Sequence, residues 1–226
     1  FMLSHAALSA VVARYAGTTD VVVGVPIAGR EDVALRDLVG MFVNTLVLRT
    51  PVDGASTVEE MLTTIRRVDV DGFAHAGVSF DDLVEALAPE RSTSHEPLVQ
   101  IAFAHTAAGA ADEMIDGLAA AGVDAEPLGV GAPVAKFDLT LSVADRSAGA
   151  PMHAELLYAT ALFDESTAQG LLDAWVSTLS AIDARAEALN TVMNTTRPRP
   201  TVSADAVADV RFGFRLAFSR AIAPVT

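Results

Sequence analysis

The chain has 226 residues, and 51% of them are hydrophobic, which is ample material for a packed core. Its 15 basic and 29 acidic residues give a formal net charge of −14, which argues against nucleic acid and against an anionic membrane surface as partners. There is no cysteine, so disulfide and thiolate chemistry are excluded. No signal peptide and no run of about 18 apolar residues is visible, which predicts a cytoplasmic protein with no membrane partner. Because the sequence begins with Phe1, we expect it to be part of a longer translation product.

The N-terminal part of the chain predicts one helix and two strands. Phe1–Tyr15 has apolar residues at helical spacing on a stripe that includes Tyr15, and Gly17 is well placed to end the helix. Val21–Ile27 is a continuous apolar run, as expected of a strand buried on both faces. Phe42–Arg49 alternates, which predicts a second strand beside the first in one sheet.

The second strand carries an amide in an otherwise apolar row. Asn44 shares one face of the strand with Phe42, Leu46 and Leu48. A buried amide must find hydrogen-bond partners or face a wet cavity. In the connection between the two strands, Gly29 allows a turn that a side chain would hinder.

Two helices are predicted next. Ser56–Phe73 shows the clearest helical pattern, and Ser56 or Thr57 can form a capping box with the glutamate three residues later. Ser79 can cap a second helix that runs to Ala88, with its apolar residues, Leu87 included, pointing inward. We expect Arg66 and Arg67 on the first of these helices to be solvated.

The second half of the chain predicts three strands and a long helix. Leu98–His105 is typical of a strand, and Phe137–Val143 with Met152–Tyr158 predicts an antiparallel hairpin. Asp164 can cap a helix that continues to about Ala188. Residues 194–200, Asn-Thr-Thr-Arg-Pro-Arg-Pro, then have the composition of a linker.

The histidines give no recognisable catalytic or metal motif. They are isolated from one another, and no HH pair, GxSxG, HExxH or GxxxxGK[ST] motif is present: His5, His75, His95, His105 and His153. We interpret His5 as a packing or helix-surface residue, because no second ligand lies at helical spacing from it. The sequence therefore predicts no catalytic residue and no metal site in this chain.

Five segments in a fixed order resemble the condensation domains of nonribosomal peptide synthetases, which belong to the chloramphenicol acetyltransferase-like superfamily. The resemblance covers Phe1 to about Ile182. The first segment is VVVGVPIAGR with LVGMFVNTLVLR. The others are HAGVSFDDLV, which is similar to the family's HQDxPFExLV, then PERSTSHEPLVQ, FDL and YATALFD. His75 begins the second segment, but Ala76, Gly77, Ser79 and Asp81 depart from the family pattern, which weakens a functional role for His75.

The resemblance implies a fold and a domain division. The expected fold is α/β, a mixed β-sheet flanked by helices, as in the C-terminal lobe of the acetyltransferase-like fold. Residues 1–188 would form that lobe, and residues 189–226 would begin the connection to an adenylation domain. The strand at Phe137–Val143 would cross to the other lobe, as the family's does, and the absence of that lobe would expose an apolar face open to self-association.

The resemblance also implies a reaction. The family forms an amide between a carrier-bound acyl or peptidyl thioester and an aminoacyl amine, both on phosphopantetheine arms that serve as substrate tethers. The family associates proton handling with an HHxxxDG motif, which this chain lacks. We therefore expect no direct cofactor and no activity from the chain alone. The expected partners are an N-terminal lobe, peptidyl carrier proteins and a downstream adenylation domain.

By resemblance, Asn44 is the candidate substrate-tunnel residue, and the alternative is a hydrogen-bonded core amide that holds the strand register. Arg66 and Arg67 have a functional alternative too, a small basic site for an acidic carrier protein. For the whole chain, the alternatives are a non-catalytic condensation-like interaction module and a lobe of a coenzyme A-dependent acyltransferase.

Overall fold

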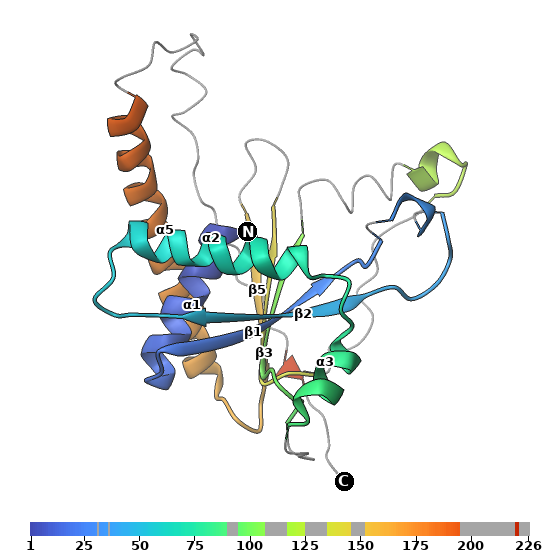
Figure 1. Ribbon diagram of the computed structural model, residues 1–226, viewed down its shortest axis with the longest axis horizontal. Coiled ribbons are helices and arrows are strands. Elements are labelled where there is room, and N and C mark those ends of the chain that lie inside the picture. Colours follow the sequence, from blue (N-terminus) through green and yellow to red (C-terminus); the bar gives the residue numbers. More distant parts are fainter. Residues whose placement is uncertain are drawn as a thin grey trace.

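The computed structural model describes residues 1–30, 32–35, 37–89, 95–106, 117–124, 135–145, 152–194 and 220–221, with side chains described up to residue 185. Within these ranges the chain forms one mixed sheet with helices packed against it (Figure 1). The fold is the predicted α/β arrangement.

The sheet has the strand order β2-β1-β3-β4-β5-β6. The strands are β1 (Asp20–Ile27), β2 (Asn44–Pro51), β3 (Ile101–Thr106), β4 (Leu139–Ala144), β5 (His153–Ala159) and the two-residue β6 (Arg220–Ala221). β1 pairs with β2 and β4 pairs with β5 in antiparallel fashion, which confirms both predicted neighbours. β1, β3 and β4 run parallel to one another.

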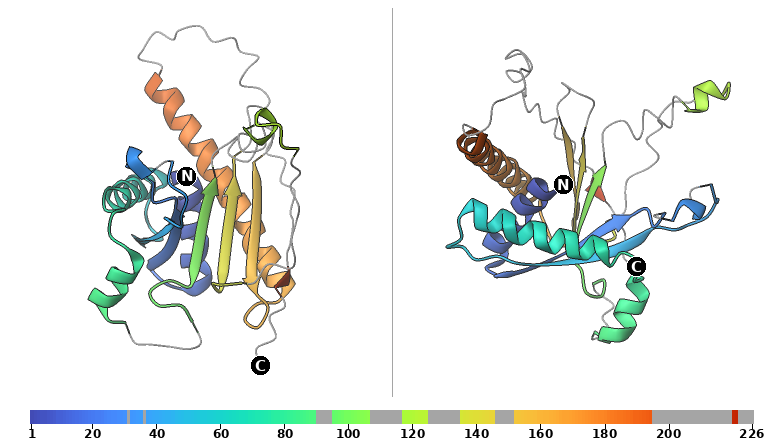
Figure 2. Two further views of the ribbon diagram at one scale, coloured as in Figure 1. Left: turned by 90° about the vertical axis from the view of Figure 1, so that its right-hand side faces the viewer. Right: turned by 45° about the horizontal axis from the view of Figure 1, so that its top comes forward.

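Three helices form a layer on the sheet (Figure 2). They are α1 (Met2–Ala16), α2 (Val58–Ala74) and α5 (Glu165–Asn194); the short α3 (Phe80–Leu87) follows α2, and a 3-10 turn, η1 (Val33–Leu35), lies between β1 and β2. α1 packs against both α2 and α5. The indole of Trp175 on α5 is buried and donates a hydrogen bond to the carbonyl oxygen of Ser4, at 3.1 Å, which ties these two helices together.

The helix ends follow the predicted capping chemistry. Thr57 and Glu60 form the capping box of α2, and the Ser79 hydroxyl accepts from the amide of Asp82 to cap α3. Asp164 Oδ1 accepts from the amide of Thr167 at 2.7 Å at the start of α5. Gly17 ends α1 in the left-handed conformation, with φ 63°.

Four expectations about the elements are wrong. Tyr15 is 55% exposed, because α1 lies between two helices and buries Ser4–Ser9 with Val11 instead of one stripe ending at Tyr15. Leu87, at the end of α3, is 61% exposed. α5 continues as a helix to Asn194, beyond the expected end. β4 does not cross to another lobe, since both its edges pair within this sheet. The linker at 195–200 and most of the connection at 107–135 fall outside the described residues.

Candidate functional site

The carboxyl ends of three strands meet at one edge of the sheet. β1, β3 and β4 are parallel and end at Ile27, Thr106 and Ala144. Ligands of open α/β sheets bind in the crevice outside the carboxyl ends of such strands. This edge is therefore the first place to look for a binding site.

Two open clefts lie at this edge, one on each side of the start of α1. The larger, of about 490 Å³, lies between α1, α5 and the ends of β3 and β4; its lining is Phe1, Met2, Leu3, Ser4, His105, Asp145, Met152, Leu179 and Asp183. The smaller, of about 380 Å³, lies between α1, α2 and the end of β1; its lining is Phe1, Val25–Arg30, Phe73 and His105. Both volumes fall within the range of small-molecule sites, roughly 300–1,000 Å³.

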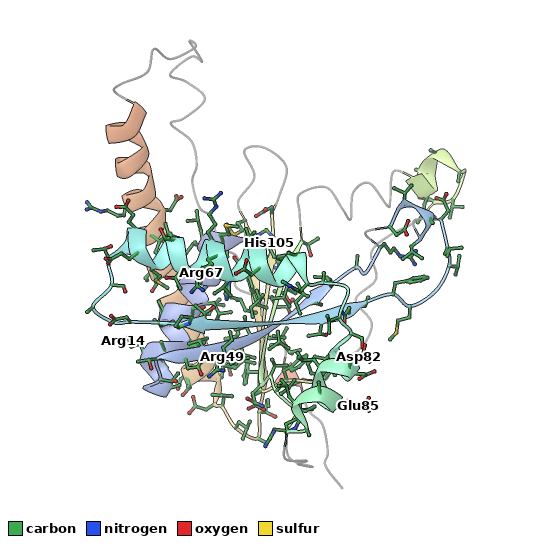
Figure 3. All side chains as sticks on the ribbon, in the orientation of Figure 1. Arg14, Arg49, Arg67, Asp82, Glu85 and His105 are labelled. Atoms are coloured by element: carbon green, nitrogen blue, oxygen red, sulfur yellow. The ribbon has the colours of Figure 1, made fainter. Side chains whose placement is uncertain are left out.

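His105, labelled in Figure 3, belongs to the lining of both clefts. Its side chain is 11% exposed, and its Nε2 lies 3.6 Å from Oδ1 of Asp145, the residue that follows β4. The rings of Phe1 and Phe103 meet the imidazole edge to face, with ring centroids 5.9 Å and 6.3 Å away. Burial lowers the pKa of His105, the N-terminal ammonium of Phe1 lowers it further, and the carboxylate of Asp145 acts in the opposite direction. The lowered pKa favours the neutral imidazole, which can accept a proton or a hydrogen bond.

Arg30 organises the connection between β1 and β2 beside the smaller cleft. Its guanidinium donates hydrogen bonds to the carbonyl oxygens of Leu35, Leu38 and Gly40, at 2.5, 2.7 and 3.1 Å. It also lies 4.3 Å from the centroid of the Phe42 ring. The same connection exposes five large apolar side chains by at least half: Val33, Leu38, Val39, Met41 and Val43. Such a concentration of exposed apolar side chains is typical of a surface that meets another protein part.

Asn44, the residue predicted to face a substrate tunnel, is the first residue of β2. Its Nδ2 donates to the carbonyl oxygens of Ala76 and Val78, at 3.1 and 2.8 Å. Its Oδ1 accepts from the amides of Thr45 and Phe80, at 2.9 and 3.0 Å. Three of these bonds, those to Ala76, Val78 and Phe80, join β2 to the segment between α2 and α3, and they support the alternative role as a structural amide. Asn44 does not line either cleft, and its contact with substrate stays a prediction.

His5 lies in the core, as the packing interpretation required. It is fully buried, and its Nδ1 lies 2.7 Å from Oδ1 of Asp69 on α2, which is also buried. Its ring stacks on Phe103, with centroids 6.1 Å apart. Asp69 Oδ2 and Ser9 Oγ are buried without a hydrogen-bond partner in the described part of the chain. The pair joins α1 to α2 in the core.

The other histidines contribute nothing to the clefts. The ring of His75 bonds the carbonyl oxygen of Asp71 in its own helix, at 2.7 Å, and that of His95 contacts the carbonyl oxygen of Glu96. Among the described residues no three His, Asp or Glu side chains cluster as a metal site would require. No helix in the described ranges is both long and apolar enough to cross a membrane.

Sequence reasoning missed the residues that line the clefts. His105 and Asp145 are adjacent only because β3 and β4 pair in parallel, with His105 opposite Val143. Asp69 lies on α2 near Arg66, Arg67 and Asp71 in the sequence, and such charged neighbours suggest a solvated position. For Arg30 there was one signal in the sequence, because it directly follows Gly29. Gly29 has φ 63° and lies in the turn that begins the connection between β1 and β2.

Comparison with known proteins identifies the family. The family model described as Condensation domain matches residues 1–201. The chain is 40% identical over 187 residues to a dimodular nonribosomal peptide synthase of Bacillus subtilis, covering 81% of this chain and 8% of that protein. It is 38% identical over 167 residues to malpinin synthetase of Mortierella alpina, covering 74% of this chain and 2% of that protein. The chain thus spans less than a tenth of the length of either relative.

Solved structures agree on the fold. The four-domain nonribosomal peptide synthetase holo-AB3403, bound to AMP and glycine, superimposes with a TM-score of 0.68 at 23% identity, covering 81% of this chain and 15% of that one. The X-domain in complex with OxyB from teicoplanin biosynthesis gives a TM-score of 0.63 at 25% identity, covering 80% of this chain and 39% of that one. The chain belongs to the condensation domain family of nonribosomal peptide synthetases.

Proposed function

We propose that this chain is the C-terminal lobe of a condensation domain that forms an amide bond between a carrier-bound acyl or peptidyl thioester and a carrier-bound aminoacyl amine. The observation that carries the proposal is the family match over residues 1–201, together with identities of 38–40% to peptide synthetases. Residues 1–188 would form the lobe, and residues 189–226 would begin the connection to the next domain.

The reaction needs mainly the alignment of two tethered ends. The amine nitrogen attacks the thioester carbonyl, the C–N bond forms, the C–S bond breaks, and the phosphopantetheine thiol leaves with a proton from the amine. An α-amine has a reference pKa of about 7.7–8.0, so a substantial fraction is already a free nucleophile near neutral pH. Holding the thioester carbonyl and the amine nitrogen in the attacking geometry can supply much of the reduction in the activation barrier.

The chain supplies one wall of the site in this proposal. It contains no HHxxxDG motif, so the proton-handling group of that motif would come from an N-terminal lobe. The clefts at the carboxyl edge of the sheet, and the exposed apolar side chains between β1 and β2, support a face that meets another part of the same domain. Carrier proteins and an adenylation domain would be the further partners, and phosphopantetheine would enter only as the substrate tether.

Amide formation with two loaded carrier proteins tests the proposal. The complete domain should transfer the acyl group from the donor carrier to the amine on the acceptor carrier, and this chain alone should form no amide above the uncatalysed rate. Turnover by the isolated chain would refute the division of roles between two lobes.

A second candidate is a non-catalytic interaction module. The likeness to the X-domain that was solved in complex with OxyB favours it. A complete domain that captures another enzyme but gives no amide product would support this module. The third alternative, a lobe of a coenzyme A-dependent acyltransferase, predicts acyl transfer from coenzyme A without any carrier protein.

A further inference from the structure

We propose that α1, α2 and β2 enclose a binding site for one internal water molecule, which bridges Ser9 Oγ on α1 and Asp69 Oδ2 on α2. The water would be a fixed part of the core and would join the two helices beside the contact of His5 with Asp69. Neither Ser9 nor Asp69 lines either cleft, so the site is separate from the candidate binding edge of the sheet. The proposal does not depend on the proposed reaction.

Two buried polar atoms call for a partner. Ser9 is fully buried and Asp69 is 1% exposed. Ser9 Oγ and Asp69 Oδ2 have no hydrogen-bond partner in the part of the chain that the structure describes. The large majority of buried polar side-chain atoms do have one, either in the protein or in ordered water, because an unsatisfied group in the core lowers stability. A shared water satisfies both atoms at once.

The hydroxyl of Ser9 is directed away from its own helix. A helical hydroxyl commonly donates to the carbonyl oxygen four residues earlier. Thr63, Ser177 and Ser180 each do so, at 2.9, 2.8 and 2.9 Å. Ser9 makes no such bond to the carbonyl oxygen of His5. Its donor and its acceptor capacity therefore both remain for a group outside α1.

The contact of Asp69 with His5 brings the carboxylate to the same face of α1. Asp69 Oδ1 lies 2.7 Å from His5 Nδ1, and His5 precedes Ser9 by four residues, so the two share one helix face. Oδ2 belongs to the same carboxylate. The hydroxyl of Thr50 on β2 is also buried and lies 3.5 Å from His5 Nε2, a contact long enough to leave it capacity for another bond.

These three side chains match the bonding of a water molecule. An internal water typically makes about three hydrogen bonds. It would accept from the Ser9 hydroxyl and donate to Asp69 Oδ2 and Thr50 Oγ1. A hard metal ion requires six or more oxygen ligands, whereas the cluster offers one carboxylate and two hydroxyls. No group of three His, Asp or Glu side chains among the described residues suits a metal.

A high-resolution crystal structure of the complete condensation domain tests the site directly. It should show one water oxygen about 2.6–3.2 Å from both Ser9 Oγ and Asp69 Oδ2. A direct bond between Ser9 and Asp69, a Ser9 hydroxyl turned to the carbonyl oxygen of His5, or a water-free contact would overturn the proposal.

Ser9→Ala separates a water-bound hydroxyl from an unpaired one by the sign of its effect on the stability of the complete domain. If Ser9 holds the water, the substitution leaves the water and Asp69 Oδ2 short of a partner, and the folded-to-unfolded ratio should fall about fivefold or more. If the hydroxyl is unpaired, the substitution removes a costly buried group and the ratio should rise. Ser177→Ala on the exposed face of α5 is the matched control for the change in helix propensity.

A double-mutant cycle of Ser9→Ala with Asp69→Ala completes the test. A bridging water couples the two side chains, so the loss in the double variant should be at least about fivefold smaller than the product of the two single losses. An additive cycle, or a Ser9→Ala variant as stable as Ser177→Ala or more stable, would contradict the shared water.

Discussion

The buried pair of His5 and Asp69 gives the sharpest test of how the helix layer is held. Replacing Asp69 with alanine removes the acceptor for His5 Nδ1, which lies 2.7 Å from Asp69 Oδ1 in a fully buried setting. The imidazole is held on its other side by Phe103 and by a long contact of 3.5 Å between Nε2 and Thr50 Oγ1, so it cannot turn to water without leaving the core.

The size of the effect follows from two opposing parts. Removing one partner of a buried hydrogen bond leaves the other group unsatisfied, which typically costs about 1–3 kcal/mol of unfolding free energy. In this protein Asp69 Oδ2 has no partner among the described residues, so the substitution also removes a polar oxygen that is costly to bury. We therefore expect a loss of about 2 kcal/mol, in the middle of that range.

Urea unfolding of the chain, followed by tryptophan fluorescence from the buried Trp175, measures this loss. Asp71→Ala is the matched control, because Asp71 is exposed on the same helix two residues later and makes the same change in helix propensity. A double-mutant cycle with His5→Ala isolates the pairwise coupling, which should exceed about 1 kcal/mol. If Asp69→Ala and Asp71→Ala differ by less than about 0.5 kcal/mol, or if the cycle is additive, the pair does not hold α1 to α2.

Two further changes test the edge of the sheet. Asn44→Ala removes three hydrogen bonds between β2 and the segment after α2, and a fourth to the amide of Thr45 within β2. At a net value of about 0.5–1.5 kcal/mol each, and with water replacing the exposed ones, the loss of unfolding free energy should be about 2–4 kcal/mol. If condensation by the complete domain falls while stability is kept, the predicted tunnel role of Asn44 is favoured over the structural one. Gly29→Ala should destabilise the chain by at least about 1–2 kcal/mol, because Gly29 has φ 63° and an added Cβ would collide with the carbonyl oxygen of Phe42. A Gly17→Ala variant has a similar φ but open space around it, so an equal loss in both would contradict the role of the collision.

Most elements could be predicted from the sequence because their signals are local. The alternation of Leu139, Leu141 and Val143 gives β4 its buried face, and Thr57 with Glu60 marks the first turn of α2. The site residues depend on long-range pairing instead. Nothing near His105 in the sequence announces Asp145, which reaches it only through the parallel register of β3 and β4.

The helix layer was harder to predict for a related reason. A helix packed on one side shows one apolar stripe, whereas α1 is covered by two helices and a sheet and buries Ser4, His5 and Ser9 with its apolar residues. The same crowding hides Asp69, whose neighbours Val70 and Asp71 are exposed. Polar residues that find partners across an interface are not distinguished in one sequence from those that face water.

β2 is an edge strand of the sheet, and its composition has a consequence for solubility. An edge strand offers unpaired backbone groups to any other extended chain, which is a route to fibrous aggregates. Pro51, the last residue of β2, has no backbone N–H that could pair with another strand. Arg49 is 73% exposed and forms an ion pair of 2.7 Å with Asp20 on the neighbouring strand, which places charged side chains at this edge of the sheet. Replacing Arg49 and Pro51 with valine would remove this protection and favour aggregation through β2. Neither residue lines the clefts, so the clefts themselves would be unchanged.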